Sequence, residues 1–204
     1  FHPFAGQSTS LFIIRDLLLN FSLPADKLFP LKRSALQMMW PEGQSGGGLV
    51  DGVDAAAFKD PVVIRRFLPS DLEAAIEIDR DVSGGYDPAI FTAFYEYHPQ
   101  STLVAEAGGI IAGFVLGFKH SPFEGRVFWL AVRPGFQGRG IGMRLMLEEI
   151  RRFRRMGAVG ATLEVRVSNK KAQSLYSMLG FRMIGVCPAY YSDGEAAIIM
   201  KLKL

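Results

Sequence analysis

Apolar and polar positions alternate from about residue 62 onward with periods that predict a regular series of strands and helices. Strand-like apolar runs cover residues 62–67, 101–108, 109–120, 125–132, 161–167, 181–191 and 195–204. Apolar residues at helical spacing cover 69–81, 87–98, 141–156 and 170–179. Most strands follow one another as hairpins and one pair is joined through a helix. We therefore expect an α/β (α+β) fold, a mixed central sheet with helices on its faces.

Residues that favour turns and helix ends lie between these segments. Ser70 precedes Glu73 by three residues, which is the spacing of a capping box. Gly108 and Gly109 separate two strands and indicate a hairpin turn. Gly180 follows the last helical segment and predicts where it ends.

The first sixty residues differ from the rest in composition. Apolar residues from Leu11 to Phe21 fall roughly at helical spacing, and a second helix is indicated around 31–39. The stretch 44–52, QSGGGLVDG, is typical of a flexible linker. We expect an N-terminal extension over 1–60 and one globular domain over 61–204.

Composition limits the class of protein. The 204 residues are 49% hydrophobic, enough for one domain with a real core. Cys187 is the single cysteine, which rules out an intramolecular disulfide, favours a reducing compartment and predicts an unreactive buried thiol. The three histidines lack ligand spacing, so we expect no metal. The apolar stretch 11–21 contains Arg15 and Asp16, so we expect a cytoplasmic protein without a membrane partner.

The charge is mildly basic, with a formal value of +3 and a pI near 9.1. This excess suits an anionic ligand but does not by itself indicate nucleic acid, and we expect no direct nucleic-acid partner. The arginines at 151, 152, 154 and 155 form a basic run that is more often a solvated helix face than a docking site. The sequence is compatible with a homodimer.

The segment Arg133–Gly142, RPGFQGRGIG, lies between a predicted strand and a predicted helix. A helix that begins near Gly140 presents unpaired backbone N–H groups, and glycines let an anion approach the backbone. Arg139 and Arg144 could add hydrogen bonds to phosphate. The alternative is a glycine-rich turn that only packs strand against helix. The arginines favour an anion site.

Two nucleotide-binding motifs compete for this loop. A Walker loop is excluded because no Gly-Lys-Ser/Thr follows the glycines. A dinucleotide fingerprint fits poorly, because five residues separate the strand from Gly138 and the third glycine position is Leu145. Glu164, about twenty residues on, lies in the middle of a strand rather than at its end, where a ribose-binding acid belongs.

The next strand and helix carry three candidate polar groups. Glu164 lies on the polar face of strand 161–167, where a partly desolvated carboxylate can serve as a general base; the alternative is an ion pair with Arg166. Tyr176 lies on the inward stripe of helix 170–179, as either a core tyrosine or a functional phenol. Asn169 is most simply the N-cap of that helix.

Together these segments resemble the GNAT superfamily of N-acetyltransferases, most of all the bacterial ribosomal-protein-alanine N-acetyltransferase and archaeal N-terminal acetyltransferases. The segments that carry the resemblance are VFWLAVRPGFQGRGIGMRLMLEEI, LEVRVSNKKAQSLYSMLGF and AYYSDGEAAIIM. The family motif Gln/Arg-x-x-Gly-x-Gly/Ala is matched by Gln137–Gly142. The resemblance covers about residues 62–204.

The resemblance implies an acetyl-CoA site and a reaction. The backbone of Leu130, Ala131 and Val132 would pair with the pantetheine arm, and Asn169 would contact coenzyme A near its thioester. Glu164 would be the general base and Tyr176 the general acid. The pyrophosphate cradle would comprise Gly138, Arg139, Gly140, Ile141, Gly142 and Met143, and Gln137 would also belong to the cofactor site.

The acceptor is expected to be a primary amine, with a protein or peptide N-terminus favoured. In related enzymes its groove lies between the segment 81–88 and the hairpin of the last two strands, so Tyr86, Tyr190 and Tyr191 are candidate walls. Two alternatives stay open. One is a small-molecule amine N-acetyltransferase, and the other is a non-catalytic acyl-CoA-binding module.

Overall fold

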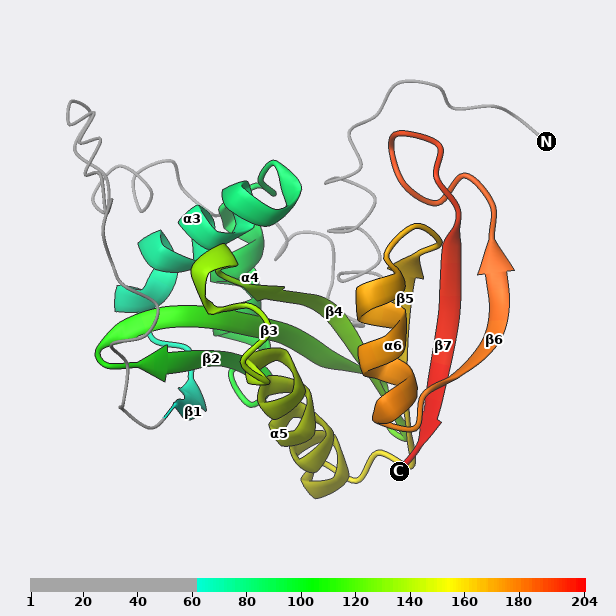
Figure 1. Ribbon diagram of the computed structural model, residues 1–204. Coiled ribbons are helices and arrows are strands. Elements are labelled where there is room, and N and C mark those ends of the chain that lie inside the picture. Colours follow the sequence, from blue (N-terminus) through cyan, green and yellow to red (C-terminus); the bar gives the residue numbers. More distant parts are fainter. Residues whose placement is uncertain (1–61) are drawn as a thin grey trace, which may run out of the picture.

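The computed structural model describes residues 62–204, in which helices cover a seven-stranded sheet on both faces (Figure 1). The predicted N-terminal helices and linker fall on residues 1–61 and lie outside the described residues. The strands are β1 (Val63–Arg66), β2 (Thr102–Ala107), β3 (Ile110–Ser121), β4 (Glu124–Val132), β5 (Gly160–Arg166), β6 (Arg182–Cys187) and β7 (Ala197–Lys203). The helices are α3 (Leu72–Ser83), α4 (Ala89–Tyr97), α5 (Ile141–Arg155) and α6 (Lys170–Met178).

The strand order across the sheet is β1-β2-β3-β4-β5-β7-β6. β4 and β5 are parallel, and the other neighbouring pairs are antiparallel. Helices α3 and α4 lie on one face, and α5 and α6 lie on the other (Figure 1). The mixed sheet with helices on its faces is confirmed. None of the helices in residues 62–204 is long and apolar enough to cross a membrane.

The amphipathic helix α5 shows how the core forms. Its residues Ile141, Leu145, Ile150 and Phe153 recur at helical spacing and are almost fully buried against the sheet. Gly125 of β4 makes room for this helix, since a Cβ there would lie 2.6 Å from the Phe153 ring. Glycine in the strand is therefore a packing requirement, and it lets the helix approach the sheet closely.

Three details differ from the sequence-based expectations. β6 ends at Cys187 and does not reach Tyr191, because Pro188 has no N–H to donate and Ala189 has a positive φ of 49°. The capping box at Ser70 is wrong: Asp71 accepts the Leu68 N–H at 2.7 Å instead. Cys187 is half-buried, where we expected a buried thiol.

Candidate active site

The parallel strands β4 and β5 diverge after a short paired stretch. Residues 124–127 of β4 pair with residues 160–163 of β5, and beyond this stretch β4 pairs with β3 and β5 pairs with β7. Trp129 and Val127 oppose neighbouring residues of β3, which leaves Phe128 as the extra residue of a β-bulge. A bulge bends its strand and turns it away from a neighbour. We call the space between 128–132 and 164–166 the fork.

The glycine-rich segment follows β4 at the mouth of the fork. Gly138 and Gly140 have positive φ values of 78° and 75°, a region that favours glycine. A Cβ at either position would meet no atom within 4 Å, so the space beside the loop is open. α5 starts at Ile141 with no acidic residue in its first turn, and its first N–H groups lack helical partners. This loop and helix start can hold an anion.

Side chains around this loop fix its position. Gln137 donates through Nε2 to the Val132 carbonyl at 3.0 Å, and Lys171 Nζ reaches Gln137 Oε1 at 3.3 Å. The Arg139 guanidinium lies 5.4 Å from the Phe136 ring centroid and stays beside the loop. Arg144, expected to add charge there, donates instead to the Val62 carbonyl at 2.7 Å. Lys171 is a cation at this site that sequence reasoning missed.

Glu164 lies on the polar face of β5, as its alternation predicts, with 17% of its side chain exposed. Its carboxylate is paired with Arg126 of β4, whose Nε and Nη2 lie 3.1 and 3.0 Å from Oε2. The alternative pair with Arg166 does not form. Arg166 is bound to Asp193 and Glu195 at 2.8 and 2.7 Å.

Tyr176 lies in α6 on the opposite face of the sheet, and Asn169 directly precedes this helix. The Tyr176 ring is buried in the core beneath α5 and α6, and this burial raises the pKa of its phenol to about 12. A phenol with such a pKa carries its proton at neutral pH. Asn169 Oδ1 accepts the Ala172 N–H at 3.0 Å, which confirms the predicted N-cap.

The three tyrosines predicted as groove walls gather on the Glu164 side. The Tyr86 ring meets Trp129 edge-on at 4.9 Å, and the Tyr190 hydroxyl accepts from Arg126 at 3.3 Å. Tyr190 and Tyr191 pack edge-on at 5.0 Å. Burial raises the pKa of Tyr86, and the nearby Asp79 and Tyr190 add to the effect. Aromatic walls and the Glu164 carboxylate thus share this face.

Two residues that organise this face were missed from the sequence. Arg126 joins β4, β5 and the segment before β7 through Glu164 and Tyr190. Asp79 of α3 is 1% exposed and accepts from the Tyr86 N–H and, at 2.7 Å, from the Ser83 hydroxyl. A signal for Asp79 was available, because an acidic residue stands on the inward stripe of α3.

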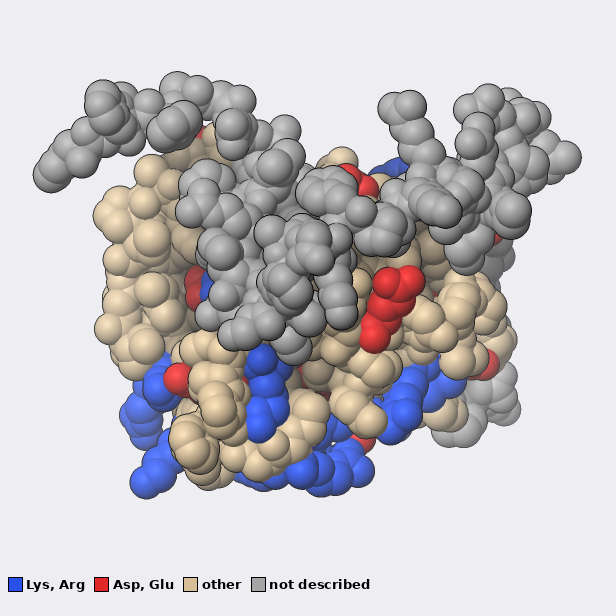
Figure 2. All heavy atoms as spheres, turned by 180° about the vertical axis from the view of Figure 1, so that it is seen from behind, with Lys and Arg blue, Asp and Glu red and all other residues tan. Residues whose placement is uncertain are grey.

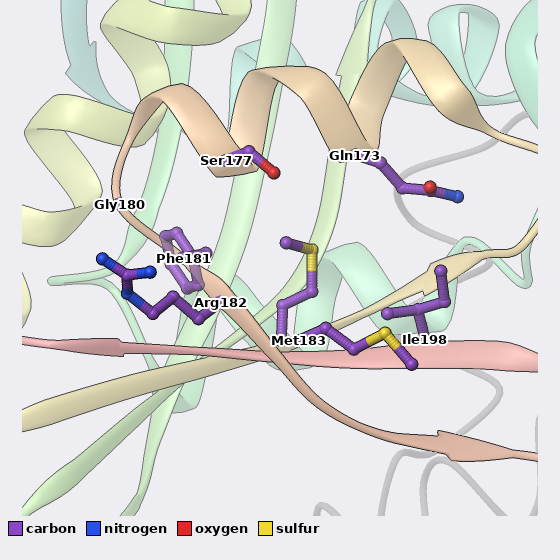
Figure 3. Close-up of a pocket in the computed structure, with 8 residues that line it drawn as sticks. Gln173, Ser177, Gly180, Phe181, Arg182, Met183 and Ile198 are labelled. Carbon is purple, nitrogen blue, oxygen red and sulfur yellow. The ribbon is translucent and has the colours of Figure 1, made fainter.

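A hollow of about 460 Å³ lies away from these groups, between α6 and the strands β6 and β7 (Figure 3). Gln173 and Ser177 of α6 line one side, and Met183 and Ile198 of the strands line the other. Neither Glu164 nor Tyr176 lines it.

Comparisons with known proteins agree with this geometry. The family model described as "Acetyltransferase (GNAT) family" matches residues 72–181. The N-alpha-acetyltransferase RimI of Mycobacterium tuberculosis is 37% identical over 150 residues, which cover 70% of this chain and 92% of RimI.

Solved structures show the same fold. Ard1 from Thermoplasma volcanium is 30% identical with a TM-score of 0.68, over 70% of this chain and 97% of Ard1. Naa20 from Chaetomium thermophilum, solved with a bisubstrate analogue, is 25% identical with a TM-score of 0.64, over 70% of this chain and 86% of Naa20. This chain is therefore a member of the GNAT family and an N-acetyltransferase with the GNAT fold.

Proposed function

We propose that this protein transfers the acetyl group of acetyl-CoA to the α-amino group of a protein or peptide N-terminus, in a ternary complex. The observation that carries the proposal is the fork, with a carboxylate on one face of the sheet and a protonated phenol in the core of the other. Such an arrangement suits a thioester that passes between two strands and needs a base on one side and an acid on the other.

The donor would bind along the fork. Beyond the bulge, the backbone of residues 130–132 borders the fork, where an extended amide-containing arm can pair with it as an added strand. The pyrophosphate would rest on the N–H groups from Gly138 to Met143, with Arg139 and Lys171 beside it. Asn169 would contact the donor near its thioester.

The reaction needs no covalent enzyme intermediate. The amine nitrogen attacks the thioester carbonyl carbon, and a backbone N–H of the β4 segment stabilises the resulting oxyanion. Glu164 takes the proton that the amine loses, directly or through water. The C–S bond then breaks, and Tyr176 gives its proton to the departing thiolate.

An α-amine suits this site because of its acidity. Its pKa of about 8 leaves roughly a tenth of the molecules uncharged at pH 7, whereas lysine at about 10.4 leaves well under a thousandth. Modest base catalysis therefore suffices for such an acceptor. The N-alpha-acetyltransferase names of RimI and of its archaeal relatives support the same acceptor.

The experiment measures coenzyme A thiol release from acetyl-CoA, with short peptides of varied first residue as acceptors. Polyamines, an aminoglycoside and N-blocked lysine peptides test the small-amine and side-chain alternatives. Peptide-dependent turnover that falls at least about tenfold in Glu164→Gln, roughly 1.4 kcal/mol of barrier, is expected. Thr162→Val, two residues earlier on the same face, is the matched control. Turnover only with small amines would reject the N-terminal acceptor, and acetyl-CoA binding without turnover would reject catalysis.

A further inference from the structure

Basic side chains from three separate parts of the chain converge at the end of the molecule opposite the mouth of the fork. We propose that this surface, which we call the basic end, binds single-stranded RNA. Figure 2 shows lysine and arginine gathered along this lower edge, where Figure 1 places the end of α5 and the C-terminus. The basic end consists of Arg151, Arg154, Arg155, Arg182, Lys201 and Lys203.

Contacts show that these parts adjoin one another. The Val159 N–H, just after α5, bonds to the Phe123 carbonyl in the β3–β4 turn, and the Leu204 N–H bonds to the Val159 carbonyl. Phe123 and Val159 share the lining of one hollow with Arg182 and the lysines of β7. The arginines of α5 therefore continue into the cations of β6 and β7 as one surface.

The positive charge of the basic end is only partly compensated. Among the described residues, Glu148 pairs with Arg151, Arg152 and Arg155, and Glu124 pairs with Lys201. Six exposed cations thus share two carboxylates, both at least three-quarters shielded from solvent. Unshared guanidinium donors on a surface are suited to bind phosphate oxygens.

An exposed aromatic ring and a hollow accompany the cations. Phe123 at the β3–β4 turn is 66% exposed. The adjoining hollow has a volume of about 480 Å³ and apolar walls at Val159, Ile184 and Leu202. Bases of single-stranded nucleic acid stack on exposed aromatic rings set among cations. Duplexes hide their bases, so this pairing of features favours an unpaired strand.

A membrane surface is the competing partner for cations beside apolar groups. Interfacial helices carry a wide apolar face opposite their cations. The apolar face of α5 is buried in the core, and its exposed C-terminal positions are arginines. A concave surface with one aromatic ring suits a nucleobase better than a bilayer.

RNA at the basic end would leave the proposed acceptor site open. β4 and β5 are parallel, so their amino ends lie at the basic end while their carboxyl ends border the fork. The cations of the basic end stand apart in the sequence, so the local pattern does not group them. The sequence-based expectation of no nucleic-acid partner stays a prediction, and the following experiment tests it.

The experiment titrates the full chain into a fluorescein-labelled single-stranded RNA of mixed sequence and about 20 nucleotides, by fluorescence anisotropy at several salt concentrations. The patch variant is Arg154→Ser with Lys203→Ser. The control variant removes the same charge elsewhere, as Arg80→Ser with Lys170→Ser, both exposed in the wild type. Thermal melting checks that both variants fold.

We expect micromolar wild-type binding that weakens as salt rises. The patch variant should bind at least tenfold more weakly. The slope of log affinity against log salt should become less steep by about 1.4, which is the share of two phosphate contacts on a single strand. Phe123→Ser should weaken binding about fivefold or more without changing that slope. Equal weakening by the control variant, wild-type binding to anionic phospholipid vesicles but not RNA, or binding to neither would overturn the proposal.

Discussion

The proposed function gives the fork two sides, a donor side for acetyl-CoA and an acceptor side for the amine, and these are built in different ways. The donor side comes from one nearly continuous stretch, in which β4, the glycine-rich loop and the start of α5 follow one another. The acceptor side combines Tyr86 of the α3–α4 segment, Arg126 of β4 and Tyr190 of the segment before β7. A local motif can specify a cofactor contact, whereas a surface assembled from distant segments depends on the whole fold.

The two sides therefore depend on different features of the chain. The donor side relies on backbone conformation, namely positive φ at two glycines and the free N–H groups of a helix start. The acceptor side relies on side-chain pairs such as Arg126 with Glu164 and Arg166 with Asp193. Substitutions should therefore affect the Michaelis constants of the two substrates separately, except where one touches the reacting atoms.

The largest expected effect concerns the proton transfer at the reacting atoms, which the proposed function places between the two sides. Tyr176→Phe removes the proposed proton donor and should lower kcat about a hundredfold with both Michaelis constants nearly unchanged. Because burial raises the Tyr176 pKa to about 12, this loss should be constant from pH 6 to 9. Steady-state kinetics over that range measures it. Tyr95→Phe on α4 is the matched control, and an equal loss there would point to a structural effect.

The next effect tests the donor side alone. Gly140→Ala places a side chain at a φ of 75°, which costs about 1–2 kcal/mol and should raise the Michaelis constant for acetyl-CoA up to about tenfold. Gly157→Ala, at a φ of 81° after α5, imposes similar strain far from the loop. Both variants should melt lower. A raised acetyl-CoA constant in the Gly157 variant would contradict a specific role for the loop.

A smaller effect tests the acceptor side alone. Asp79→Asn keeps one oxygen but weakens the bonds to the Tyr86 N–H and the Ser83 hydroxyl. The peptide Michaelis constant should rise about fivefold while that for acetyl-CoA stays constant. Glu73→Gln, an exposed acid in the first turn of the same helix and outside the segment 81–88, is the control. Equal changes in both constants would show that the two sides are not independent.

The smallest expected effect is on the stability of the fold, through a buried carboxyl on α5. Glu149 is fully buried on α5 and burial raises its pKa well above the usual range, so the carboxyl stays protonated when folded. The unfolded chain loses this proton near pH 4.3, so the free energy of unfolding falls as the pH rises from there through the folded pKa. Glu149→Gln should remove that loss, and urea unfolding at pH 5 and pH 8 measures it.

The neighbouring residue provides the control of opposite sign. Burial acts to raise the pKa of Glu148, but the hydrogen bond from Arg155 and the charge of Arg152 outweigh it and lower the pKa. Glu148→Gln should therefore be less stable than the wild type at both pH 5 and pH 8, and this difference should shrink as the pH falls below about 4. If Glu149→Gln is also less stable than the wild type at pH 8, the interpretation of Glu149 as a buried neutral carboxyl is wrong.

Periodicity and glycine position predicted most of the fold. The order of strands and helices in 62–204, the loop before α5 and the N-cap at Asn169 follow from local patterns. The partner of Glu164 could not be predicted, because Arg126 is brought to it by strand pairing across 38 residues of sequence. The end of β6 also depended on local backbone conformation at Ala189. The pattern of apolar and polar residues along the chain does not show which distant residues strand pairing brings together.

The fork has a further consequence for the ligand-free protein. Two strands that part leave main-chain N–H and C=O groups along residues 128–132 without a neighbouring strand on the β5 side. The Val132 carbonyl accepts from Gln137, and water must solvate the other groups until something else pairs with them. Under the proposed function, the acyl donor serves as a missing eighth strand, so its binding should slow amide hydrogen exchange in this segment and raise the melting temperature with donor concentration. An amine would then meet a completed sheet, which favours an ordered sequence in which the donor binds first.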